Sequence, residues 1–199
     1  MVERDVVVMT PPEGGTAQSD AELISQAGRS PECFAAVFDR HYRHIYAYAA
    51  RRLGRDLAED VASETFLVAF DRRAGYDTTR ADARPWLYGI ASNLIARQGT
   101  AESRRYKMLA QLGHGDRVDT HDDAVGRLDA TAVRGRLAAA LARLPQPVRD
   151  VLLLVAWAGL NQNEAAAALD IPPGTARSRL HRARQEMRQA LGADMEVQG

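Results

Sequence analysis

Hydrogen-bonding side chains gather on one side of the last helical stretch of the sequence, residues 175–191. At about 100° per residue, they lie opposite a stripe of apolar residues. This arc collects Ser178, His181, Arg182 and Gln185, with Arg177 at its shoulder. Such side chains can bond base edges and phosphates in the major groove of DNA. Arg179 falls on the far flank near Glu186, which makes it a weaker candidate for base contact.

The residues around this arc complete a helix-turn-helix pattern. Asn161 and Glu164 have the spacing of a capping box, and the alanine-rich helix that follows to Leu169 can let another helix approach closely. Residues 170–174 form the expected turn, in which Ile171 fills the space between the helices. The stripe of the second helix is Ala176, Leu180, Ala183, Met187 and Leu191. The pattern favours DNA binding; the alternative is a solvated, arginine-rich helix.

A second candidate nucleic-acid surface lies on a helix expected to begin near Pro85. Its outer face brings several side chains within about 40° of each other at helical spacing: Trp86, Asn93, Arg97, Thr100 and Arg104. An aromatic ring, an amide and arginines suit unstacked bases and phosphates. Two interpretations of Trp86 stay open, because the same ring can belong to the core. Gly99 interrupts this helix.

The formal net charge is zero, but acids and bases are segregated along the chain. Five acids and no base lie between Asp56 and Asp71, whereas bases dominate from Arg84 to Lys107. An acidic face suits a basic protein partner, and a basic face suits nucleic acid. Ordinary solvated helix faces would show the same pattern, so charge alone does not decide.

The sequence offers no catalytic or metal-binding constellation. His41 and His44 stand three apart, but no third ligand lies at a suitable spacing. Ser63 and Ser178 have no evident base partner, and no glycine-rich phosphate loop is present. The single cysteine, Cys33, excludes an internal disulfide. We expect a protein that is not an enzyme and uses no cofactor or metal.

These side chains require a helical scaffold, because apolar residues recur at intervals of three and four and none alternate as in strands. We predict an all-α fold of two small helical domains joined by a flexible linker, the second containing the helix-turn-helix. The expected ranges are a tail at 1–19, a first domain at 20–108, a linker at 109–130, a second domain at 131–192 and a tail at 193–199. The longest apolar run, Val151 to Leu160, is short for a membrane span of roughly 20 residues. A cytoplasmic protein without membrane contact of its own is expected.

The pattern also predicts which residues form the cores. The first long helix should end at Gly54 and bury Phe34, Val37, Phe38, Ile45, Ala49 and Leu53. The next, residues 57–70, is apolar on two sides and should be central, and a loop at 72–83 follows it. The third buries Leu87, Ile90, Ala91, Leu94 and Ile95. In the second domain the inward residues are Val133, Leu137, Leu141 and Leu144, then Val148, Val151, Leu152 and Val155.

With these elements in place, the chain resembles the extracytoplasmic-function sigma factors, the smallest bacterial sigma factors. The family's first two conserved helices are similar to FAAVFDRHYRHIYAYAARRLG and DLAEDVASETFLVAF. Its promoter-melting and −10 recognition segment is similar to RPWLYGIASNLIARQ. Its −35-reading domain is similar to LARLPQPVRDVLLLVAWAGLNQNEAAAALDIPPGTARSRLHRARQEMRQAL. The four blocks occur in the family's order over roughly residues 20–106 and 130–191.

The resemblance implies a sigma factor that binds core RNA polymerase and directs it to the −10 and −35 elements of promoters, in a stress- or signal-responsive regulon. It implies an anti-sigma factor as a further partner, and a linker threaded through the polymerase. Polymerase contact is implied for Glu59, Asp60, Glu64 and Phe66. Contact with the −10 element is implied for Trp86, Asn93 and Arg97, with the 72–83 loop capturing a flipped base. Contact with the −35 element is implied for Thr175, Arg177, Ser178, His181, Arg182 and Gln185.

The main alternative is a helix-turn-helix regulator that acts without replacing the sigma subunit. It explains residues 130–191 equally well, but it leaves the acidic helix and the Trp86 segment without a role. A pure protein-interaction module is disfavoured by the two basic faces.

Overall fold

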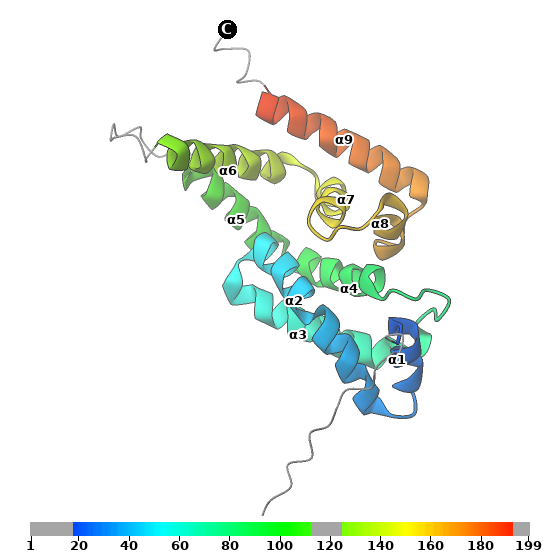
Figure 1. The fold of residues 1–199 in the computed structure, drawn as a ribbon. Coiled ribbons are helices and arrows are strands. Elements are labelled where there is room, and N and C mark those ends of the chain that lie inside the picture. Colours follow the sequence, from blue (N-terminus) through cyan, green and yellow to red (C-terminus); the bar gives the residue numbers. More distant parts are fainter. Residues whose placement is uncertain (1–17, 113–124, 193–199) are drawn as a thin grey trace, which may run out of the picture.

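The structure is a computed structural model that describes residues 18–112 and 125–192. Within these ranges it contains helices and no strand, which confirms the predicted all-α fold (Figure 1). Two 3-10 turns, η1 (Pro31–Cys33) and η2 (Arg73–Gly75), flank the first two long helices. The α-helices are α1 (Asp20–Gln26), α2 (Phe34–Leu53), α3 (Arg55–Arg72), α4 (Arg84–Arg97), α5 (Gly99–Leu112), α6 (Val125–Arg143), α7 (Gln146–Ala156), α8 (Gln162–Ala168) and α9 (Pro173–Gly192).

Helices α2, α3 and α4 form the core of the N-terminal unit. Gly54, at φ +97°, ends α2 and turns the chain directly into α3, as expected from a residue without Cβ. The predicted stripe of α4, residues 87, 90, 91, 94 and 95, is buried. Phe38 was expected inside but is 38% exposed. Its ring lies at the edge of the core, 5.0 Å from the ring of Phe66, and covers it.

Helices α5 and α6 extend into both ends of the expected linker. Residues 109–112 belong to α5 and residues 125–130 to α6, so the predicted boundaries 109 and 130 are wrong. The two helices pack along each other, with Leu109, Leu112, Leu137 and Leu141 around a common groove. This tertiary contact stabilises terminal turns that are too short, and too close to the polar glycine-bearing segment between them, for an apolar stripe to predict a helix. The rest of the linker, 113–124, and most of both expected tails lie outside the described residues.

Helices α6 to α9 form the C-terminal unit, and most of their ends lie at the prolines, glycine and capping residues expected from the sequence. Pro145 ends α6, Gly159 at φ +68° follows α7, and Asn161 with Glu164 forms the capping box of α8. Helix α9 begins at Pro173, so the turn is shorter than the predicted 170–174, because proline suits the first helical turn. Buried positions include the expected Leu141, Leu144, Val148 and Val151. Val133, expected inside, is 46% exposed, whereas Leu153 and Leu154 are fully buried.

The two units touch where α4 crosses α8 (Figure 1). A Cβ atom on Gly89 of α4 would lie 2.3 Å from the carbonyl oxygen of Ala168, the last residue of α8. Such a distance is far inside van der Waals contact, so the approach requires glycine. The prediction that the alanine-rich helix admits a close neighbour is confirmed, and the neighbour is α4.

Four charged side chains are buried where the units meet. Arg52 of α2 donates to Glu102 of α5 (Nε–Oε1 2.6 Å) and to Asp150 of α7 (Nη2–Oδ1 2.5 Å). Arg149 of α7 donates to the other oxygen of Glu102 at 2.9 Å. The Tyr48 hydroxyl accepts from Arg52 at 2.9 Å. Two arginines and two carboxylates therefore balance each other in the interface, which is what buried charges require.

Candidate nucleic-acid and polymerase-binding surfaces

The hydrogen-bonding arc of α9 faces solvent. Ala176, Leu180 and Ala183 are buried on the opposite side, which confirms the predicted orientation of the helix. Thr175 is half-buried at the start of the helix, and the remaining candidates are exposed: Arg177, Ser178, His181, Arg182 and Gln185. The Ser178 hydroxyl donates to the carbonyl of Thr175 at 3.0 Å. Residues 175–185 of α9 thus present polar side chains on a helix whose other face is held in the core.

Arg182 carries the ion pair of this arc. Its Nε donates to Oε1 of Glu186, one turn later, at 2.7 Å. The sequence places Arg179 on the far flank of the helix near Glu186, and both of these side chains are half-buried in the structure. An exposed pair at this spacing stabilises by only about 0.3–0.5 kcal/mol. The Arg182 guanidinium can therefore exchange its partner for a base edge or a phosphate at little cost.

The outer face of α4 is divided between solvent and core. Asn93 and Arg97 are exposed, whereas Trp86 is half-buried. The indole packs against the core and lies 4.9 Å from the ring of Tyr76, centroid to centroid. The interpretation of Trp86 as a core residue therefore holds in part, and the accessible portion of the ring leaves base contact a prediction.

The chain between η2 and α4 forms an ordered loop, residues 76–83, beside this face. The Tyr76 hydroxyl donates to the carbonyl of Arg80 at 2.6 Å. Asp77 accepts from the Thr79 hydroxyl at 2.6 Å and from its amide at 3.1 Å. Burial, followed by the negative charge of Asp20 and Asp82, raises the pKa of Tyr76 to about 12, so the phenol stays a donor.

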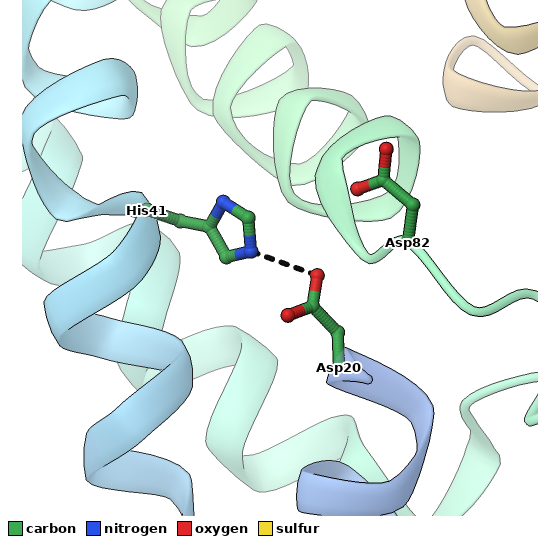
Figure 2. A group of neighbouring side chains, drawn as sticks. All are labelled: Asp20, His41 and Asp82. Atoms are coloured by element: carbon green, nitrogen blue, oxygen red, sulfur yellow. Dashed lines mark hydrogen bonds and ion pairs between the residues drawn. The ribbon is translucent and has the colours of Figure 1, made fainter. Parts of the chain in front are cut away.

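The base of this loop is tied to α1 and α2 by Asp20 (Figure 2). One oxygen of the Asp20 carboxylate accepts from His41 Nε2 at 2.8 Å and from the Ala83 amide at 2.9 Å. The other accepts from Arg40 at 2.5 Å. Burial alone would raise the pKa of Asp20, but these bonds lower it to about 2. Because the carboxyl is ionised, it is His41 Nε2 that donates.

No role for Asp20 was predicted from the sequence, and His41 was considered only with His44 as a metal pair. In the structure His41 is buried and His44 is exposed. His41 lies instead near Asp20 and Asp82, each offering an atom within 4.8 Å of the others. Both carboxylates are already occupied by donors, since Asp82 accepts from the Arg84 amide and guanidinium at 2.8 Å. Both carboxylates are thus satisfied by donors and hold backbone, whereas the buried Nδ1 of His41 has no hydrogen-bond partner among the described residues.

Helix α3 presents the acidic face. Glu59, Asp60 and Glu64 are exposed, as expected. Phe66 was grouped with them, but it is 4% exposed and packs beneath Phe38 and Tyr42, so it does not lie on this surface. Helical spacing instead puts Leu67, 66% exposed, on the same face as Asp60 and Glu64. The sequence missed Leu67 because an exposed leucine cannot be told from a buried one by type.

None of the helices in the described parts of the chain has the length and apolar character of a membrane span.

Comparisons with known proteins match the N-terminal unit and the C-terminal unit to two separate family models. The family model for Sigma-70 region 2 matches residues 37–105, and that for Sigma-70, region 4 matches residues 134–187. The chain is 30% identical over 173 residues to the ECF RNA polymerase sigma factor SigL of Mycobacterium tuberculosis, covering 86% of this chain and 96% of that one. It is 29% identical over 168 residues to SigW of Bacillus subtilis, covering 80% and 89%.

Two solved structures are similar in fold. The structure of CnrH in complex with the cytosolic domain of CnrY aligns with a TM-score of 0.62 at 25% identity, covering 88% of this chain and 98% of that chain. The sigma factor RpoE in complex with the anti-sigma factor NepR, from Bartonella quintana, aligns with a TM-score of 0.56 at 23% identity, covering 82% and 99%.

Proposed function

This chain belongs to the extracytoplasmic-function (ECF) RNA polymerase sigma factors, and from that membership we propose which of its surfaces carries out each part of promoter recognition. As a sigma factor it binds core RNA polymerase and directs it to promoter DNA. The separate regulator considered from the sequence is thereby set aside, since region 2, with the acidic α3 and with α4, is present as well as the helix-turn-helix.

We propose that α9 reads the −35 element through its exposed arc. The observation that carries this proposal is the orientation of the helix, with its apolar stripe in the core and its arginines, serine and histidine in solvent. The first turns of such a helix enter the major groove in helix-turn-helix proteins. Arg182 is the candidate for a bidentate contact with guanine. Thr175, Arg177, Ser178, His181 and Gln185 supply the neighbouring contacts.

The −10 element is assigned to α4 and the loop before it. Asn93 and Arg97 are exposed on one face, and the accessible part of Trp86 lies next to the ordered loop 76–83. Aromatic rings, amides and arginines of this kind bind unstacked bases. The polymerase is assigned to the acidic face of α3, formed by Glu59, Asp60, Glu64 and Leu67.

The two promoter elements are farther apart than the two units of this structure. By their numbering they lie about 25 base pairs apart, which is roughly 85 Å of B-form DNA. Here α4 and α8 touch. The units must therefore separate when both elements are bound, so the structure corresponds to a closed form of the free factor.

The partners of the solved relatives support a further proposal. CnrH is in complex with CnrY, and RpoE with the anti-sigma factor NepR. We propose that an anti-sigma factor also binds this chain and places a signal-responsive set of promoters under its control. The factor would act in the cytoplasm as a binding subunit without chemistry of its own.

Promoter selection by holoenzyme tests the assignment of α9. Core polymerase with the full-length chain selects open complexes from duplex DNA randomised across the upstream region, and the recovered DNA is sequenced. Arg182→Ala is expected to relax base preference at one or two positions of the upstream block, by about 1–3 kcal/mol for a lost bidentate contact. Arg179→Ala is expected to lower recovery evenly across sequences, as loss of a phosphate contact would.

Arg188→Ala, an exposed arginine in the last turns of α9, is the matched control and should leave the preference unchanged. An unchanged upstream preference with Arg182→Ala, or the same effect from Arg182→Ala and Arg179→Ala, would contradict the assignment. Failure of the wild-type chain to support any promoter-specific transcription would contradict the function as a whole.

A further inference from the structure

Helix α1 lies outside the part of the chain that matches the region 2 model, which begins at residue 37. Its first residue nevertheless reaches the segment assigned to the −10 element. Asp20 is 3% exposed, although aspartate is rarely buried without a specific partner. Its surroundings therefore call for an explanation beyond its place in the first turn of a seven-residue helix that Ser19 caps.

Both the backbone and the side chain of Asp20 hold the end of the loop. The Asp20 amide donates to the carbonyl of Ala81 at 3.1 Å, and its carboxylate accepts from the amide of Ala83 at 2.9 Å. Ala83 is fully buried and is the residue before α4. Loss of the carboxylate would leave a buried amide without its partner, which the chain can relieve only by moving the loop.

His41 fixes the position of that carboxylate. It lies in the middle of α2, is buried, and donates from Nε2 to the same oxygen that accepts from Ala83 (Figure 2). Arg40 holds the second oxygen but is partly exposed. The carboxylate thus accepts hydrogen bonds from two side chains of α2 and from the backbone amide that precedes α4.

We propose that Asp20, oriented by His41, is a positioning residue for −10 recognition: it fixes the loop and the start of α4 in one conformation. Three residues later, Trp86 packs against Tyr76 of the same loop, so the indole and the loop share the support that Asp20 provides. A flipped base would then meet a preformed site rather than a loop that must be ordered on binding. This inference rests on the proposed role of α4 and the loop in binding the −10 element.

Four variants of the full-length chain test it, each assembled with core polymerase and put through promoter selection from randomised duplex DNA. Asp20→Ala removes the carboxylate that binds the Ala83 amide, and His41→Leu removes the donor that orients this carboxylate. His41→Gln keeps an N–H donor that reaches Asp20. Glu22→Ala is the matched control in α1, because Glu22 bonds the Ser19 amide at 2.8 Å and makes no loop contact in the described residues. Hydrogen exchange of the Ala83 amide in the free chain reports on the loop without DNA.

Asp20→Ala and His41→Leu are expected to weaken base preference within the −10 block by about tenfold, equivalent to about 1.4 kcal/mol. The −35 preference and the affinity for core polymerase should stay unchanged, and exchange at Ala83 should accelerate. His41→Gln and Glu22→Ala should retain the −10 preference. If Asp20→Ala does not fold, the comparison of His41→Leu with His41→Gln decides the question in its place.

Several results would overturn the inference. One is a −10 preference that survives in both Asp20→Ala and His41→Leu. Another is a parallel loss of −10 preference, −35 preference and polymerase binding, which indicates general destabilisation. A third is a loss in Glu22→Ala equal to that in Asp20→Ala. If the wild-type chain selects no −10 block at all, the proposed function of α4 and the loop fails, and the inference fails with it.

Discussion

Phe66 and Leu67 are neighbours in α3, but one is buried and the other is exposed. Their roles therefore depend on position in the helix and not only on apolar character. Phe66 packs under Phe38 and Tyr42, whereas Leu67 projects into solvent between acidic side chains. We infer that Phe66 supports the acidic face from below, while Leu67 supplies the apolar contact that a charged surface alone lacks.

This division predicts different losses for the two alanine variants. Phe66→Ala should lower the free energy of unfolding by about 3–5 kcal/mol, because it leaves a cavity in the core. Leu67→Ala should change stability by less than about 0.5 kcal/mol and yet weaken binding to core polymerase. Urea unfolding and a titration against core polymerase measure the two effects. Equal polymerase affinity for Leu67→Ala and wild type would remove Leu67 from the interface.

The Asp20 carboxyl predicts acid sensitivity. Its pKa is about 2 in the folded chain and 3.8 in the reference state, so the unfolded chain binds more protons between these values. The stabilisation it provides is complete above pH 3.8 and is lost as the pH falls toward 2. Urea unfolding across this window should show a steeper decline for the wild type than for Asp20→Asn. Asp71→Asn, at an exposed site on α3, should decline like the wild type; parallel curves for all three would contradict the assignment.

At the scale of elements, helix positions and the buried faces of α4 and α9 could be predicted because apolar periodicity and capping residues are local signals. The ends of α5 and α6 could not, since the contact between these helices decides whether residues 109–112 and 125–130 are helical. The candidate site likewise has one part that local sequence signals predict and one part that they do not. The exposed arc of α9 follows from helical phase, whereas the bond from Asp20 to Ala83 joins residues 63 apart in sequence.

The crossing of α4 and α8 predicts an unusual result for a glycine-to-alanine change. Within a helix such a change ordinarily stabilises by about 1 kcal/mol. Gly89→Ala should instead separate the two units, because the new Cβ would lie 2.3 Å from the carbonyl oxygen of Ala168. Small-angle scattering should report a larger radius of gyration than for the wild type. Gly75→Ala, where a Cβ meets nothing within 4 Å, is the control. An unchanged radius for Gly89→Ala would show that the helices adjust without parting.

At the scale of the whole molecule, buried charges hold together parts of the chain that the sequence treats as separate. Arg52 and Asp150 are 98 residues apart. Because charged residues are rarely fully buried, the apolar periodicity of the sequence predicted neither of them as a core residue. Burial alone would lower the pKa of Arg52, but the Tyr48 hydroxyl, which accepts from the guanidinium, and the carboxylates of Asp150 and Glu102 outweigh it and hold the pKa above its usual range. The guanidinium therefore remains charged in the interface.

Removal of Arg52 should be costly because it leaves Asp150 without a cation and Glu102 with Arg149 alone. Arg52→Met leaves Glu102 and Asp150 without their shared cation, and such a loss destabilises by about 3–5 kcal/mol. Arg43→Met, at an exposed site on the same helix, should change stability by less than about 0.5 kcal/mol. Urea unfolding of both variants measures the difference. A loss below about 1 kcal/mol for Arg52→Met would mean that water already reaches the four charges.

The arrangement of this network also constrains how such factors can be recombined. Each unit contributes one arginine and one carboxylate, Arg52 with Glu102 and Arg149 with Asp150, so neither unit leaves with a net charge when the two part. A hybrid that joins this N-terminal unit to a foreign C-terminal one inherits half of the set. Unless the foreign unit carries an arginine and an aspartate at the positions of Arg149 and Asp150, we expect the hybrid to bind DNA with both units. When free, it should not adopt the closed form in which the two units touch.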